Sequence, residues 1–117
     1  MTLLRLALTS ALLLAPTLSQ ANDFPTADRV LYVQECVRDN PGPHYEMINK
    51  CSCALDKIAG EVKFAEFTSM STVVKAISIG GERGGQMRDN ESLKPQIARY
   101  RELQAKARKA CFIGPPQ

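Results

Sequence analysis

The sequence contains a single histidine, His44, and this scarcity limits the catalytic chemistry open to the chain. A Ser-His-Asp triad needs a base beside its nucleophile, and zinc sites need several histidine, cysteine or carboxylate ligands. Neither a Gly-x-Ser-x-Gly nor a His-Glu-x-x-His pattern occurs. Asp56 and Glu66 lie on expected helix faces, where solvated carboxylates are common. We therefore predict that the chain is not an enzyme, and we expect no metal ion or other cofactor.

The sequence also lacks a strong excess of one charge. It has 15 Lys plus Arg and 12 Asp plus Glu. The first 21 residues contain one charged side chain, Arg5, so residues 22–117 keep 14 basic and 12 acidic residues, a net charge of +2. Nucleic-acid-binding domains usually carry a much larger positive bias. We expect no nucleic-acid partner.

After residue 21 no apolar run is long enough to cross about 30 Å of hydrocarbon, so we expect no membrane span. The start of the chain differs. Residues 6–14 are mostly Leu and Ala behind Arg5, Pro16 interrupts the run, and Ser19-Gln20-Ala21 places small residues at two cleavage positions. This pattern is typical of a secretory signal peptide. We predict a signal peptide over residues 1–21, a mature domain over residues 22–117, and a periplasmic location.

All four cysteines follow the predicted leader. They are Cys36, Cys51, Cys53 and Cys111. A domain of this size buries only about 60 to 65% of its unfolded surface, and an oxidising compartment allows disulfides to make up the deficit. An even number of cysteines therefore favours two structural disulfides.

Apolar periodicity predicts four helices after the leader. The first covers residues 27–38, the second runs from the Pro-Gly-Pro turn to near Gly60, the third covers residues 65–78 and the fourth covers residues 92–111. The first has Val30, Val33 and Val37 on one face. The second has the clearest stripe, which includes Ile48 and Leu55. The third is rich in β-branched residues in its second half, so a short strand competes there. We predict an all-α, four-helix, disulfide-stapled domain.

The Cys-Ser-Cys motif falls inside the second expected helix, where residues two apart point about 200° apart. A bridge between Cys51 and Cys53 would be strained, so each is expected to pair with Cys36 or Cys111. We slightly favour Cys36–Cys51 with Cys53–Cys111, because Cys36 is close to the turn and Cys51 is the nearer partner. The alternative, Cys36–Cys53 with Cys51–Cys111, stays open because Cys111 shares the inner face of its helix.

The same motif has a functional alternative, a carrier of copper or of thiol–disulfide equivalents. His44, Met47, Met70 and Met87 would be additional copper ligands. Two arguments weigh against this reading. Met47 and Met70 fall near apolar stripes and suit a core, and Cys51 lies in mid-helix rather than at an exposed helix start, where reactive thiols are found.

Residues 80–89 contain four glycines and no apolar period, so we expect a surface loop. The segment lacks the Lys-Ser/Thr ending of a nucleotide-binding loop. A plain connector is the simplest interpretation. In the functional interpretation, Arg83 and Arg88 bind carboxylates of a partner through paired hydrogen bonds.

The last expected helix is strongly basic for a nearly neutral domain. Between residues 93 and 111 it has six Lys and Arg against Glu102. Those near its end complement the helix dipole, and the rest form a solvated face or a docking stripe. We predict a partner-binding surface that combines the Gly-rich segment with this helix, through Arg83, Arg88, Arg99, Arg101 and Lys106.

Three blocks, Cys51–Ala59, Phe64–Phe67 and Gly81–Asp89, with Cys36 before them and Cys111 after, resemble a group of small exported proteobacterial proteins. That group has four cysteines, a Cys-Ser-Cys motif and no assigned activity. The resemblance spans most of the mature chain. It implies an envelope location and an association with periplasmic cytochrome or quinoprotein dehydrogenase systems, and it supplies no catalytic residues.

These observations together predict a non-enzymatic periplasmic accessory or binding protein. Disulfide-linked helices form its scaffold, and the Gly-rich segment and the last helix contact a periplasmic protein partner. A copper or thiol–disulfide carrier is the first alternative function, and a small envelope chaperone or inhibitor is the second.

Overall fold

The computed structural model describes residues 22–115, and the predicted signal peptide lies outside the described residues. This part of the chain is all-helical, as predicted, and contains no strand. Its helices are α2 (Thr26–Asp39), α3 (His44–Glu61), α4 (Phe64–Ile77), α5 (Gly81–Arg88) and α6 (Lys94–Ala110), with the short 3-10 helix η1 (Glu91–Leu93) before α6. Residues 22–115 contain five α-helices, whereas four were expected. No helix in this range is long and apolar enough to span a membrane.

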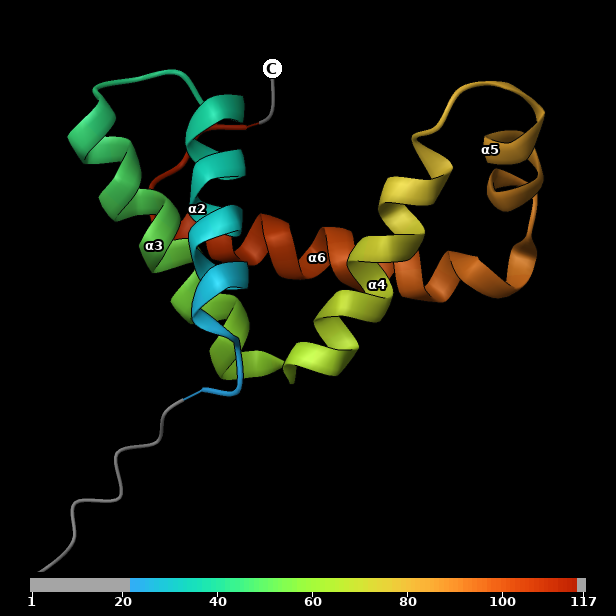
Figure 1. Cartoon of the computed structure of the whole chain (residues 1–117), viewed down its shortest axis with the longest axis horizontal. Coiled ribbons are helices and arrows are strands. Elements are labelled where there is room, and N and C mark those ends of the chain that lie inside the picture. Colours follow the sequence, from blue (N-terminus) through green and yellow to red (C-terminus); the bar gives the residue numbers. More distant parts are fainter. Residues whose placement is uncertain (1–21, 116–117) are drawn as a thin grey trace, which may run out of the picture.

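Helix α6 connects the two halves of the molecule (Figure 1). The antiparallel pair α2 and α3 lies at its C-terminal end, and α3 packs against it. Helix α4 packs against its N-terminal half, with α5 beyond. As a result, α2 and α4 stand apart from each other along α6.

The hydrophobic core is centred on α3. Its buried residues are Met47, Cys51, Ala54, Leu55 and Ile58. These confirm most of the predicted stripe, although Ile48 is exposed. The other helices contribute less, since α4 buries only Met70 and α6 buries three residues. Met47 and Met70 are thus core residues, as predicted.

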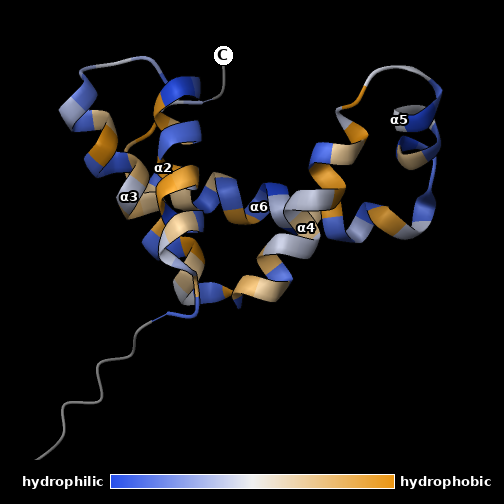
Figure 2. Ribbon diagram, in the orientation of Figure 1, coloured by the Kyte–Doolittle hydropathy of each residue, from blue (hydrophilic) through white to orange (hydrophobic). Residues whose placement is uncertain are grey.

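Helix α2 differs from the expectation, because none of its residues is buried. Val33 and Val37 are half-buried against the core, and the Val30 side chain is 50% exposed. Figure 2 shows hydrophobic positions along α2. The apolar period predicted the helix correctly, but α2 lies beside α3 and no further element within residues 22–115 covers this face.

Both disulfides join α3 to other parts of the chain. They link Cys36 to Cys51 and Cys53 to Cys111, which is the pairing favoured from the sequence. The first ties α3 to α2 and the second ties it to the end of α6. The α4–α5 half of the molecule has no disulfide.

The prediction of a Gly-rich surface loop over residues 80–89 is wrong, because residues 81–88 form the helix α5. Gly81 has φ +83°, a conformation that side chains disfavour. A Cβ atom on Gly84 would lie 1.7 Å from the carbonyl oxygen of Ile79. The glycines therefore allow α5 to turn back closely against the end of α4.

The ends of several other elements also differ from the expectation. Helix α3 continues through Gly60 to Glu61, and the β-branched part of α4 is helical, so the competing strand is wrong. Two residues after the end of α6 the backbone has an unusual geometry. Phe112 has φ +58°, the left-handed conformation in which glycine usually ends a helix, and its side chain is 83% exposed.

Candidate functional site

The structure separates the two parts of the predicted basic surface. Arg83 and Arg88 belong to α5, which contacts α4 and η1, whereas Lys106 lies near the opposite end of α6. Arg88 also has a structural role, since its guanidinium donates hydrogen bonds to the carbonyl oxygens of Ile77 at 2.8 Å and Ile79 at 3.0 Å. These bonds satisfy acceptors at the end of α4.

The predicted cations of α6 do not share one surface either. Arg99 pairs with Glu66 at 3.2 Å, and Lys106 pairs with Glu61 at 2.7 Å. Arg101 is exposed and lies about 200° around the helix from Arg99. Two of these three cations thus have an acidic neighbour in the chain, and partner binding by this set stays a prediction.

The four cysteines are all in disulfides, and Cys51 is fully buried. A copper or thiol carrier would first have to reduce a bridge. Within residues 22–115 no three His, Cys, Asp or Glu side chains are grouped so that they could hold a metal ion.

An apolar groove lies between α2 and α3, with a volume of about 610 Å³. Its apolar lining consists of Val30, Val33, Val37, Ile48 and Leu55. The titratable side chains that line it are all basic, namely Arg29, Arg38 and His44. Two of these have acidic neighbours, because Arg29 pairs with Asp56 at 2.8 Å and Arg38 with Asp39 at 2.9 Å. The groove therefore combines an apolar floor with a basic rim.

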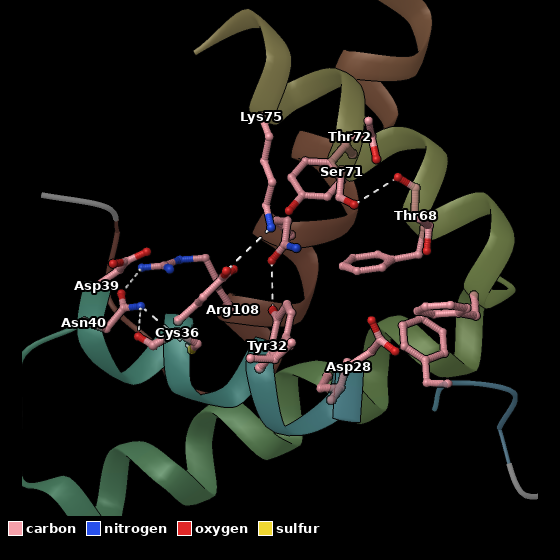
Figure 3. Close-up of a pocket in the computed structure, with 18 of the residues that line it drawn as sticks. Asp28, Tyr32, Cys36, Asp39, Asn40, Thr68, Ser71, Thr72, Lys75 and Arg108 are labelled. Carbon is pink, nitrogen blue, oxygen red and sulfur yellow. Dashed lines mark hydrogen bonds and ion pairs between the residues drawn. The ribbon is translucent and has the colours of Figure 1, made fainter. Parts of the chain in front are cut away.

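A second hollow, the α2–α4 cleft, lies over α6 and has a volume of about 370 Å³ (Figure 3). Five aromatic residues line it: Phe24, Tyr32, Phe64, Phe67 and Tyr100. Phe67 is the hub of this aromatic cluster, with ring centroids 5.3 Å from Phe24, 6.2 Å from Tyr32 and 5.9 Å from Tyr100. These separations suit edge and tilted aromatic contacts.

The α2 wall of the cleft is acidic. Asp28, Glu35 and Asp39 lie on it at spacings of seven and four residues, which puts them on one helix face. Opposite them, Lys75 of α4 reaches across and pairs with Glu35 at 3.5 Å. Arg108 of α6 donates to the Asn40 side chain at 2.8 Å and to the Gly114 carbonyl. Both cations of the cleft are therefore engaged within the chain.

Tyr32 joins the cleft wall to its floor. Its hydroxyl donates a hydrogen bond of 3.0 Å to the side-chain oxygen of Gln104. Burial, and to a lesser extent the neighbouring Tyr100, raise the pKa of Tyr32 to about 12, which means that the fold favours the neutral phenol. It acts as a fixed neutral donor.

Neither hollow was predicted from the sequence. The spacing of Asp28, Glu35 and Asp39 was a usable signal, since it places three carboxylates on one face of a helix whose other face has three valines. The aromatic cluster could not be recognised from a sequence pattern, because its members come from separate segments of the chain. Comparisons of the chain with protein-family models, with curated proteins and with solved structures found no match.

Proposed function

We propose that this chain is a non-enzymatic accessory protein of the cell envelope, which binds an acidic amphipathic helix of a partner protein in the α2–α3 groove. The observation that carries the proposal is the exposure of α2. No residue of α2 is buried, although three of its valines line the open groove. The apolar face of α2 is therefore not covered by any element in residues 22–115. Such grooves are a recurring site for amphipathic helices.

The rim of the groove selects the charge of the partner. Within the described part of the chain, the titratable residues that line the groove are Arg29, Arg38 and His44. Carboxylates beside the apolar stripe of a partner helix would therefore meet basic groups. Because two of these residues already have acidic neighbours, the rim contributes more to association rate and specificity than to affinity. The apolar floor supplies most of the binding free energy.

Two features support an envelope setting for this function. The disulfides suit an oxidising compartment, and the chain resembles exported proteins associated with periplasmic cytochrome or quinoprotein dehydrogenase systems. We therefore propose a periplasmic component of such a system as the partner. An envelope chaperone or inhibitor would use the same groove with a different occupant.

Two neighbouring residues of α2 provide a matched test. Val30 lines the groove and is 50% exposed, whereas Leu31 lines the α2–α4 cleft and is 57% exposed. A photo-crosslinker at position 30 should trap a periplasmic protein through a helix with acidic residues, and one at position 31 should not.

Substitution then tests affinity for the trapped protein. V30E places a carboxylate in the apolar groove and should weaken binding at least about tenfold, because a buried charge needs a partner. L31E should leave binding unchanged, and circular dichroism should show both variants folded. Equal affinities for V30E and L31E would contradict the proposal, as would crosslinking that maps to a basic or non-helical segment.

A further inference from the structure

We propose that the α2–α4 cleft binds a small organic cation, a monoamine or quaternary ammonium compound with a compact apolar body. This site lies on the opposite side of α2 from the proposed partner groove and does not depend on it. Its volume of about 370 Å³ is in the range of small-molecule sites, which is about 300 to 1,000 Å³.

The aromatic residues of the chain are concentrated in this cleft. The sequence has four Phe and three Tyr, and the cleft is lined by five of these seven. Four of the five, Tyr32, Phe64, Phe67 and Tyr100, are only half-buried, so part of each ring remains accessible. Ring faces attract ammonium groups through their negative quadrupole, and apolar surface beside them binds the body of such a ligand.

The charges around the rings select a cation over an anion. Asp28 lies one helical turn before Tyr32 and points toward the cleft in Figure 3. Among the described residues its carboxylate forms no hydrogen bond or ion pair. Glu35 and Asp39, in contrast, are paired with Lys75 and Arg38. Asp28 is thus the carboxylate available to an ammonium group beside the rings.

The far end of the cleft is less favourable for a second positive charge, because its two carboxylates, Glu35 and Asp39, are already paired within the chain. Lys75 and Arg108 line that end. A second cationic group on the ligand would approach these two side chains, and like charges at close range are unfavourable. A polyamine is therefore disfavoured. The Thr68 and Thr72 hydroxyls on the α4 wall offer hydrogen-bond partners for a neutral polar group.

Asp28 also has an ordinary structural role, which the test must separate from ligand binding. It lies in the first turn of α2, where a carboxylate stabilises the helix dipole. Loss of that interaction would lower stability slightly and would not change which ligands bind. Charge preference is therefore the decisive measurement.

Three compounds of similar shape measure that preference: 2-phenylethylamine, 2-phenylethanol and phenylacetate. The purified protein is titrated with each at neutral pH, and amide NMR shifts report affinity and location. We expect the amine to shift resonances of cleft residues and to bind at least about tenfold more tightly than the alcohol, with phenylacetate weakest. Binding of phenyltrimethylammonium should resemble that of the amine.

Substitutions test whether Asp28 produces the preference for the amine over the alcohol. D28N should remove most of the preference for the amine over the alcohol, because only the attraction of the rings remains, whereas E46Q, a substitution at a carboxylate outside the cleft, should change nothing. The V30E variant should bind the amine normally, so the proposal for this cleft and the proposal for the α2–α3 groove can be contradicted independently. The proposal is overturned if the alcohol binds as tightly as the amine, if D28N keeps the preference, if the shifts lie outside the cleft, or if none of the cations binds at millimolar concentration.

Discussion

The carboxylate of Asp23 accepts a hydrogen bond from the backbone N–H of Phe64, with both oxygens 3.1 Å from that nitrogen. The first residues of the described chain thereby satisfy a donor at the start of α4, where α4's own N-cap residue, Lys63, forms no side-chain cap. Phe24 packs beside it against the Phe64 ring, with centroids 5.3 Å apart. A short segment before α2 thus holds the beginning of α4 in place.

Removing this cap should destabilise the fold. We expect D23A to lower the free energy of unfolding by about 1 kcal/mol, as for other lost N-terminal caps, while D23N keeps an acceptor and loses less. Urea denaturation followed by circular dichroism measures both. Equal stability of D23A and the wild type would show that water replaces the carboxylate without cost.

Adjacent glycines in α5 should respond to substitution in opposite ways. A Cβ at Gly84 would clash with the Ile79 carbonyl, so G84A should cost at least about 2 kcal/mol or detach α5 from α4. At Gly85 the nearest atom is an Arg88 side-chain nitrogen at 3.7 Å, which is ordinary contact, and G85A should gain a few tenths of a kcal/mol from helix propensity. Thermal unfolding compares the pair. Similar melting temperatures would contradict the close approach of the two segments.

The two disulfides should contribute unequally to stability. Cys53–Cys111 closes 58 residues and Cys36–Cys51 closes 15. Chain entropy predicts about 4 kcal/mol for the longer loop and about 3 kcal/mol for the shorter. The double variants C53A/C111A and C36A/C51A, compared by urea denaturation, should therefore differ by about 1 kcal/mol. A larger loss from C36A/C51A would mean that packing around buried Cys51 outweighs chain entropy.

Stability should fall at strongly alkaline pH in a way that depends on Tyr32. Burial raises the pKa of Tyr32 from 10.0 to about 12, which means that the fold favours the neutral phenol. This contribution is complete below pH 10, the value for the unfolded chain, and is lost as the pH rises through 10 toward 12. The free energy of unfolding of Y32F should decline less over that interval. Parallel pH profiles for Y32F and the wild type would contradict the assignment.

The predictions from sequence were most accurate where a local pattern is sufficient. Helix α3 has a long apolar stripe, and Cys51 is the nearer partner of Cys36 across the turn before this helix; both the helix and the favoured disulfide pairing are confirmed. Helix α5 was missed because its glycines are poor helix formers in isolation. Its position depends on tertiary contacts, the close packing of Gly84 on Ile79 and the Arg88 bonds to the end of α4.

The hollows were missed for a related reason. A stripe such as that of Val30 and Val33 identifies an apolar helix face, but the sequence does not say whether another element covers it. The α2–α4 cleft depends on how far apart two helices stand along α6, and Phe24, Phe67 and Tyr100 meet there from distant positions. Such distances are properties of the packed molecule.

The geometry of Phe112 has an evolutionary consequence. The chain keeps a large aromatic ring in water at a position where glycine would relieve an unfavourable backbone conformation by about 1 kcal/mol. A library randomised at position 112 and selected only for heat resistance should therefore enrich glycine. Retention of phenylalanine in a population selected for the cellular role of the protein would show that this ring is kept for something other than folding.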